Sequence, residues 1–234
     1  VLAPRTPDEA RTQVADVAAQ KVDIVKIRVD DNLGTTPKMT PEVYRAVIDE
    51  AHKRGMRVAT HLFYLADAKS LLDAGSDFVA HSIRDADVDA DLIAKLEARN
   101  ICVSPTLMRE VSTFVYESTP SFFSDSLFLT HANREWMASL EKPEAQRAMR
   151  ASPAAQRYKV ALEVAKRNLK RLSDAGVPIA MGTDTGPTGR FQGYFELMEL
   201  EQMVSAGLTQ RQALTAATQG AARCMKLDRD LGTV

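Results

Sequence analysis

The sequence is short of cysteine, of aromatic residues and of net charge. Only 2 of its 234 residues are cysteine, which excludes a small disulfide-rich scaffold. Lysine and arginine number 30 against 31 aspartates and glutamates, so no basic field attracts phosphate backbones and we expect no nucleic-acid partner. No apolar run approaches the ~20 residues that span a bilayer, so we expect no membrane partner. These exclusions leave a small-molecule substrate as the expected partner, with a homo-oligomer left open.

The two cysteines and the first residue bear on where the protein works. Cys102 lies in a strand-like run and Cys224 in a helix-like one, so we expect two buried thiols, which weakly favours the cytoplasm. Val1 is not a start residue, and the residues after it have neither the charge nor the length of a signal peptide. We expect the natural N-terminus to lie upstream, so localisation cannot be read from this sequence.

What the sequence does have is an alternation of helix-like segments and short apolar runs. Five runs each follow a helix-like segment and close on a polar residue; they span 22–27, 56–61, 77–81, 101–106 and 177–184. This alternation predicts an α/β fold with a parallel sheet. Because the runs are apolar throughout, both faces of the sheet should be covered, as in a barrel or a doubly wound sheet. No Gly-x-Gly-x-x-Gly or phosphate loop is present, which favours the barrel.

Capping residues give the helix boundaries. Thr6 with Glu9, and Thr209 with Gln212, form capping-box starts, and glycines follow several helix-like segments. We expect helices at about 7–20, 41–54, 67–74, 88–99, 154–175, 193–205 and 209–225.

A long insertion, 107–152, breaks the alternation between the fourth run and the next helix. It concentrates aromatic residues, namely Phe114, Tyr116, Phe122, Phe123, Phe128 and Trp136, in a chain that is 6% aromatic. Since it leaves the sheet where strands end, the insertion is predicted to cover a pocket on the strand-end face. The alternative is a helical excursion that packs on the rim of the barrel.

Four of the five runs end at residues that bind metals or move protons: Lys26, His61, His81 and Asp184. Parallel strands deliver such side chains to one end of a sheet. Neutral imidazoles and a carboxylate are ligands that zinc accepts. Each residue also has a simpler interpretation, as an ion-paired lysine, a hydrogen-bonding histidine or a turn-forming aspartate. His52 and His131, on a helix and in the insertion, are interpreted as structural.

The ordered set of segments resembles the metal-dependent amidohydrolase superfamily, most closely its imidazolonepropionase-like and Xaa-Pro dipeptidase-like branch. The segments that carry the resemblance are 23–26, 51–61, 74–81, 105–107, 175–184 and 206–222. The resemblance implies a distorted (β/α)8 TIM-like barrel with one or two divalent metals, usually zinc (Zn²⁺). It implies that Lys26 is a carboxylated bridging lysine, that His61 and His81 are metal ligands, and that Asp184 is both a ligand and the catalytic proton carrier.

The sequence departs from that family at its beginning and end. The His-x-His pair of the family's first strand has no counterpart, only five runs are present, and no return to a β-sandwich follows. We therefore expect residues 1–234 to form one partial barrel domain, about strands 4 to 8. Without the first-strand histidines it should bind at most one metal tightly.

The expected reaction is hydrolysis of a C–N bond in a cyclic amide, an N-acyl amino acid or a dipeptide-like substrate, by metal-activated water. Candidate substrate-binding residues are Tyr64, Arg109, Tyr116, Arg190 and Tyr194; an arginine among them can grip a carboxylate, or simply form a salt bridge at the rim. The alternative is an inactive incomplete barrel that serves as a binding or assembly module, or a sequence fragment. Upstream sequence with a strand-one His-x-His pair favours the enzyme, and a start codon at Val1 favours the alternative.

Overall fold

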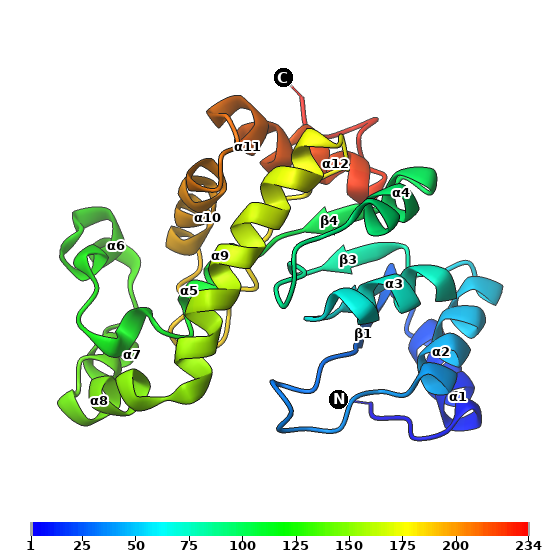
Figure 1. Cartoon of the computed structure of the whole chain (residues 1–234), viewed down its shortest axis with the longest axis horizontal. Coiled ribbons are helices and arrows are strands. Elements are labelled where there is room, and N and C mark those ends of the chain that lie inside the picture. Colours follow the sequence, from blue (N-terminus) through cyan, green and yellow to red (C-terminus); the bar gives the residue numbers. More distant parts are fainter. Residues whose placement is uncertain (1, 234) are drawn as a thin grey trace. The chain divides into compact units, whose positions relative to one another are not determined.

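The computed structural model describes residues 2–233 and shows alternating helices and strands (Figure 1). The chain forms two compact units. The first contains the residues up to Ser104 together with Arg171–Ile179, and the second contains Pro105–Lys170 together with the residues from Ala180. The single domain predicted for residues 1–234 stays a prediction.

The first unit is built on a parallel sheet, as the sequence predicted. Its strands are β1 (Ile24–Arg28), β2 (Arg57–His61), β3 (Phe78–Ala80) and β4 (Cys102–Ser104), and they lie in the order β1-β2-β3-β4. The helices of this unit are α1 (Pro7–Ala19), α2 (Pro41–Lys53), α3 (Leu65–Ala74) and α4 (Ala90–Ala98). The α/β class is therefore confirmed, whereas closure into a barrel stays a prediction.

The predicted helix ends follow from local chemistry. Thr6 Oγ1 accepts a hydrogen bond from the backbone N–H of Glu9 at 3.2 Å and begins α1. Gly75 ends α3 at a φ of 110°, a left-handed conformation that a side chain would oppose. Helix α4 begins slightly later than expected, because the Asp89 side chain accepts from Leu92 N and fixes the start at Ala90.

The fifth run does not form the predicted strand. Within residues 177–184 only Ile179 pairs with the sheet, in one isolated parallel bridge to Val103. The Val103 N–H donates to the carbonyl oxygen of Pro178 at 2.9 Å. Proline has no N–H to return to a ladder, and β4 offers only three residues to pair with, so pairing stops after one bridge.

The strand register places four valines on one face of the sheet and Lys26 on the other. Val25, Val58, Val79 and Val103 share one face through the strand register, and all are buried. Lys26 lies on the opposite face and is exposed, because successive residues of a strand point to opposite sides.

The second unit is helical in the part of the chain that the structure describes. Its elements are α5 (Leu107–Val111), η1 (Val115–Glu117), η2 (Ser121–Ser124), α6 (Ser126–His131), α7 (Arg134–Leu140), α8 (Pro143–Ala151), α9 (Pro153–Asp174, which belongs to this unit as far as Lys170), α10 (Tyr194–Ser205), α11 (Gln210–Ala217) and α12 (Gln219–Met225). The elements from α5 to α8 make up the predicted insertion, and Figure 1 shows α6, α7 and α8 grouped together.

The insertion contributes an aromatic core to the second unit. The ring of Phe128 lies 5.1 Å from that of Phe122, 5.3 Å from that of Phe123 and 4.8 Å from that of Phe191, centroid to centroid. Aromatic rings in these edge and stacked arrangements gain about 0.5–1.5 kcal/mol per pair beyond burial. The insertion thus packs within its own unit, and its predicted role as a cover for the strand ends stays a prediction.

Two further expectations need correction. The helix expected at 209–225 is divided at Thr218, whose φ of −122° and ψ of −98° end α11 and start α12. Cys102 and Cys224 are buried as expected, but they are not thiols: the structure gives both as disulfide-bonded. Burial and element type were the only signals available, and neither distinguishes a thiol from half of a disulfide.

No helix among residues 2–233 is both long enough and apolar enough to cross a bilayer.

Candidate functional site

The carboxyl ends of β2 and β3 bring two of the predicted ligands together. His61 is the last residue of β2 and pairs in register with Ala80, the last residue of β3, so His81 follows directly beyond it. The two imidazole rings lie 4.3 Å apart, centroid to centroid, at an interplanar angle of 69°. His81 is buried, and its backbone N–H donates to Ser104 O at 2.9 Å. The histidines therefore occupy the same end of the sheet and are in contact.

Several residues that follow the apolar runs have a left-handed backbone. The φ values are 80° at His81, 49° at Thr106 and 59° at Asp184. Residues other than glycine avoid this region, at a cost of about 1–3 kcal/mol each, and such residues cluster at functional sites. Two of these residues, His81 and Asp184, are predicted ligands. Positive φ values also occur at Lys21, Asn32, Leu33, Asn100 and Lys226, so the backbone alone does not mark the site.

Asp30, which the sequence interpretation did not select, forms a hydrogen bond with His61. Its Oδ2 lies 2.8 Å from His61 Nε2, and its side chain is not exposed to solvent. Burial alone would raise the pKa of Asp30, but hydrogen bonds from His61 and from the Asn32 N–H, with the charge of Arg84, hold this pKa well below its usual range. An ionised carboxylate only accepts hydrogen bonds, so His61 donates through Nε2.

The tautomer of His61 follows from this bond. A neutral imidazole that carries its proton on Nε2 has its lone pair on Nδ1. Histidines that bind metals commonly donate their second ring N–H to a carboxylate in this way. The sequence signal for Asp30 was present but weak: it is an acidic residue just beyond β1, at the same strand end as the histidines.

Arg84 is a second residue that sequence reasoning missed. It is among the largest fully buried side chains, and its Nη1 donates to the carbonyl oxygens of Leu62 at 3.0 Å and Ser82 at 2.6 Å. These carbonyls belong to the residues immediately after His61 and His81. Arg84 therefore ties the two histidine-bearing segments together and fixes their spacing.

Lys26 lies on the same face of the sheet as His61. Lys26 pairs in register with Ala59, and Arg28, two residues further along β1, pairs with His61. At ~3.3 Å per residue this places its Cα about 6–7 Å back along the strand, a distance that the four-carbon lysine stem can span. The position of Lys26 is thus compatible with its predicted role, which stays a prediction.

Tyr64 lies close to the same strand end. Its hydroxyl donates to Asp31 Oδ1 at 2.8 Å, and Lys38 Nζ lies 4.3 Å from the centre of its ring. Asp31 belongs to the loop after β1, so Tyr64 is held against that loop.

Asp184 lies in the second unit, where Arg190 binds it. Arg190 Nη1 donates to Asp184 Oδ2 at 2.5 Å and to the Asp184 carbonyl oxygen at 3.1 Å, while Arg190 Nε donates to Ser112 Oγ at 3.1 Å. Next to them, Glu196 accepts from the hydroxyls of Thr183 and Thr185, both at 2.7 Å. The Asp184 segment is therefore fixed on both sides by charged hydrogen bonds.

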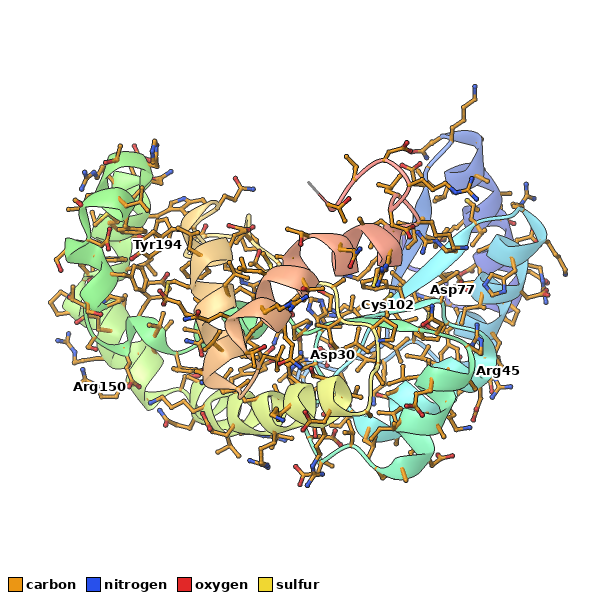
Figure 2. All side chains as sticks on the ribbon, turned by 90° about the horizontal axis from the view of Figure 1, so that it is seen from above. Asp30, Arg45, Asp77, Cys102, Arg150 and Tyr194 are labelled. Carbon is orange, nitrogen blue, oxygen red and sulfur yellow. The ribbon has the colours of Figure 1, made fainter. Side chains whose placement is uncertain are left out.

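The three other candidate substrate residues make interior contacts in the second unit. Arg109 is buried, bonded to Glu110 Oε1 at 2.9 Å, with its guanidinium 5.0 Å from the centre of the Tyr158 ring. The hydroxyl of Tyr116 donates to the Gly189 carbonyl. Tyr194, labelled in Figure 2, packs at 5.1 Å from the Phe128 ring. Their roles toward a substrate stay predictions.

The donor set at the sheet end fits a divalent metal of borderline softness. Two imidazoles in contact, one of them backed by a carboxylate, are a typical partial ligand set for zinc. Residues 2–233 contain no group of three or more His, Cys, Asp or Glu side chains that are close enough together to hold a metal ion. His52, interpreted as structural, bonds to Asp77 Oδ2 at 2.7 Å.

Comparison with known proteins gives one family. The model of the amidohydrolase family matches residues 5–234. A Xaa-Pro dipeptidase structure with bound methionine in the active site aligns with 98% of this chain and 50% of its own, at 21% identity and a TM-score of 0.71. A putative prolidase from Bifidobacterium longum aligns over 97% and 51%, at 25% identity and a TM-score of 0.68.

A third solved structure, A. niger ochratoxinase, aligns over 95% of this chain and 44% of its own, at 17% identity and a TM-score of 0.67. The chain thus spans about half the length of the solved structures that it matches. No curated protein matches it.

Proposed function

Because the chain belongs to the amidohydrolase family, we propose that it hydrolyses a C–N bond by means of metal-activated water, with zinc as the metal. The observation that carries the proposal is the contact between His61 and His81 at the ends of neighbouring parallel strands. The Asp30 carboxylate bonded to His61 Nε2 supports it, because it directs Nδ1 toward the role of ligand.

The residues proposed to hold the metal are Lys26, His61, His81 and Asp184. Bound there, a divalent ion would lower the pKa of a water toward ~7 and polarise the carbonyl of the scissile bond. Lys26 serves only if its amine is carboxylated, because a bare ammonium repels a cation. Asp30 and Arg84 keep the two imidazoles in one orientation through their bonds to His61 and to the backbone around both histidines.

Asp184 is proposed to move the proton. Its carboxylate accepts a proton from the attacking water and passes it to the leaving nitrogen, which is general acid-base catalysis and contributes about 10²–10⁴-fold. Arg190 holds Asp184 Oδ2 and fixes the direction of that carboxylate. In this arrangement Arg190 is a positioning residue, because its guanidinium already binds a carboxylate of the chain itself.

The proposed substrates are cyclic amides, N-acyl amino acids and dipeptide-like compounds. Structures of a Xaa-Pro dipeptidase and a putative prolidase among the similar proteins favour the dipeptide-like class. Tyr64, Tyr116 and Tyr194 offer phenol groups, and Arg109 a guanidinium, to such a substrate. Arg109 would have to leave Glu110 to bind a substrate carboxylate, so we rank it last.

Metal affinity tests the site without knowledge of the substrate. Titration of the apo-chain with zinc should give one tight equivalent, and His61→Asn or His81→Asn should each weaken binding at least tenfold. His52→Asn is the matched control. His52 lies on α2 and bonds to Asp77, so this substitution should leave the zinc affinity unchanged. Equal zinc binding by all four proteins would contradict the site.

Activity is then tested with one substrate of each class. Glycyl-proline, N-acetyl-methionine and hydantoin are incubated with the zinc-loaded chain, and amine release or ring opening is measured. We expect turnover of at least one, abolished in His61→Asn. No turnover by this chain, and none after restoration of any upstream coding sequence, would overturn the proposed hydrolysis.

A further inference from the structure

The second unit contains a cavity that is lined by Tyr194, a candidate substrate residue, but by none of the residues proposed to hold the metal or move the proton. It has a volume of about 540 Å³ and lies between the α6–α7 segment and the start of α10. Phe128, His131, Trp136, Phe191 and Tyr194 contribute its ring-bearing walls. Cavities of ~300–1,000 Å³ are typical of small-molecule sites.

The walls are aromatic and are fixed by contacts with one another. Phe128 and Phe191 meet edge to face, with ring centroids 4.8 Å apart and planes at 82°. The Trp136 ring lies 5.7 Å from Phe191, and the Tyr194 ring 5.1 Å from Phe128. Since Phe128 and Phe191 are both buried, their orientations are set before any ligand arrives. The lining is thus rich in rings held in fixed positions, and a further aromatic ring prefers edge-to-face or offset contacts with such rings.

In the part of the chain that the structure describes, the lining of the cavity contains no carboxylate, ammonium or guanidinium group. The described residues that line it include no Asp, Glu, Lys or Arg, and their polar side chains are those of His131, Asn133, Gln192 and Tyr194. Asn133 Oδ1 already accepts a hydrogen bond from the backbone N–H of Trp136 at 3.0 Å. The side-chain amide nitrogen of Asn133 is therefore the group that can donate to a ligand. A charged ligand would lose its hydration here without gaining a counter-ion. An uncharged ring has no such desolvation cost.

We propose that this cavity binds an uncharged aromatic ring. Resting on the proposed function, we further assign that ring to the substrate, because Phe191 and Tyr194 continue the segment in which Arg190 holds Asp184. The site therefore selects C–N substrates that carry an aromatic group over those that carry only small aliphatic ones.

Trp136 makes the binding directly measurable, because it is the only tryptophan of the chain and it lines the cavity. The probe is 4-nitrobenzyl alcohol, an uncharged ring that quenches tryptophan fluorescence. We expect saturable quenching of Trp136, reversed by excess benzyl alcohol but at least tenfold less effectively by cyclohexylmethanol. Quenching that rises linearly without saturation, as collision alone produces, would overturn the proposal.

Two variants and a control locate the binding. Ala132→Phe places a ring in the cavity and should weaken probe binding at least tenfold, while Ala138→Phe, on exposed α7 surface, should not. Leu197→Glu introduces a charge at a half-exposed lining position, so folding should survive and binding should weaken. Full binding in both Ala132→Phe and Leu197→Glu, with native circular dichroism, would show that the ring binds elsewhere.

The substrate assignment has its own readout. With any substrate class that is turned over, a benzyl-bearing member should have a KM at least tenfold below that of its methyl counterpart, and Ala132→Phe should remove the difference. Saturable probe binding with equal KM values would overturn the assignment of the ring to the substrate. Probe binding without any turnover would instead count against the proposed hydrolysis alone.

Discussion

His61 Nε2 donates a hydrogen bond to Oδ2 of Asp30 across 2.8 Å, at a point where the Asp30 side chain has no contact with solvent. A buried carboxylate without a hydrogen-bond partner costs free energy, so this hydrogen bond holds both side chains in one orientation. The bond fixes the tautomer of His61, and with it the ring nitrogen, Nδ1, that carries the lone pair.

Asp30→Asn should therefore weaken zinc binding by about 10–100-fold, because the amide no longer enforces donation from Nε2. Nitrogen-15 chemical shifts of His61 should show loss of the single tautomer, which a purely structural role of Asp30 would not predict. Asp31→Asn is the neighbouring control, since Asp31 bonds to Tyr64 instead. Wild-type zinc affinity and an unchanged tautomer in Asp30→Asn would contradict the role.

Kinetics can distinguish two roles of Arg190, positioning of Asp184 and binding of the substrate. If Arg190 positions Asp184, Arg190→Lys should lower kcat about tenfold or more and leave KM within about twofold. Lysine keeps the charge but cannot reach Ser112 and Asp184 at once, as Nε and Nη1 of the guanidinium do. Arg211→Lys, on the exposed surface of α11, is the control. A raised KM at unchanged kcat would show that Arg190 grips the substrate after all.

Glu199 gives a pH dependence that does not involve the proposed site. It is fully buried on α10 and accepts from the backbone N–H groups of Leu107 and Met108 at 2.8 and 2.7 Å. Burial raises the pKa of Glu199 to about 8, although these two hydrogen bonds act to lower it. The carboxyl group of the folded chain thus keeps a proton that the unfolded chain releases near 4.5.

Because the folded pKa is the higher one, this proton stabilises the fold fully below pH 4.5, and the contribution is lost as pH rises toward 8. We expect the free energy of unfolding, followed by urea and Trp136 fluorescence, to fall across this window. Glu199→Gln cannot titrate and should lack most of the slope, whereas Glu201→Gln, exposed on the same helix, should keep it. A slope that persists in Glu199→Gln would exclude Glu199 as its source.

The sheet predicts self-association of the isolated chain. Strand β1 is at an edge of the sheet in the described structure, and an edge strand offers unpaired N–H and C=O groups to another chain. We expect size-exclusion chromatography at low micromolar concentration to show oligomers or poor recovery, and a longer protein with additional N-terminal strands to be well behaved. A stable monomer with one cooperative melt would contradict this expectation.

Local patterns in the sequence determined much of the fold. The alternation of apolar runs and helices gave the parallel sheet, and four of the five expected strands formed with His61 and His81 at the correct ends. Threonine caps and Gly75 gave helix boundaries because each acts on its own turn of the chain. Family membership also followed from the sequence, since ordered short segments survive where overall identity does not.

Tertiary structure alone decided the contacts between residues far apart in sequence. Asp30 meets His61, and Glu199 reaches the start of α5, only because strand register and helix packing bring them together. The fifth run remained a single bridge because pairing depends on the partner strand as well as on the run itself. Helix propensity and capping act over a few residues, whereas the partner of a buried charge depends on the path of the chain through the whole unit. The sequence therefore indicated which end of the sheet carries the histidines. The structure showed which side chains orient them.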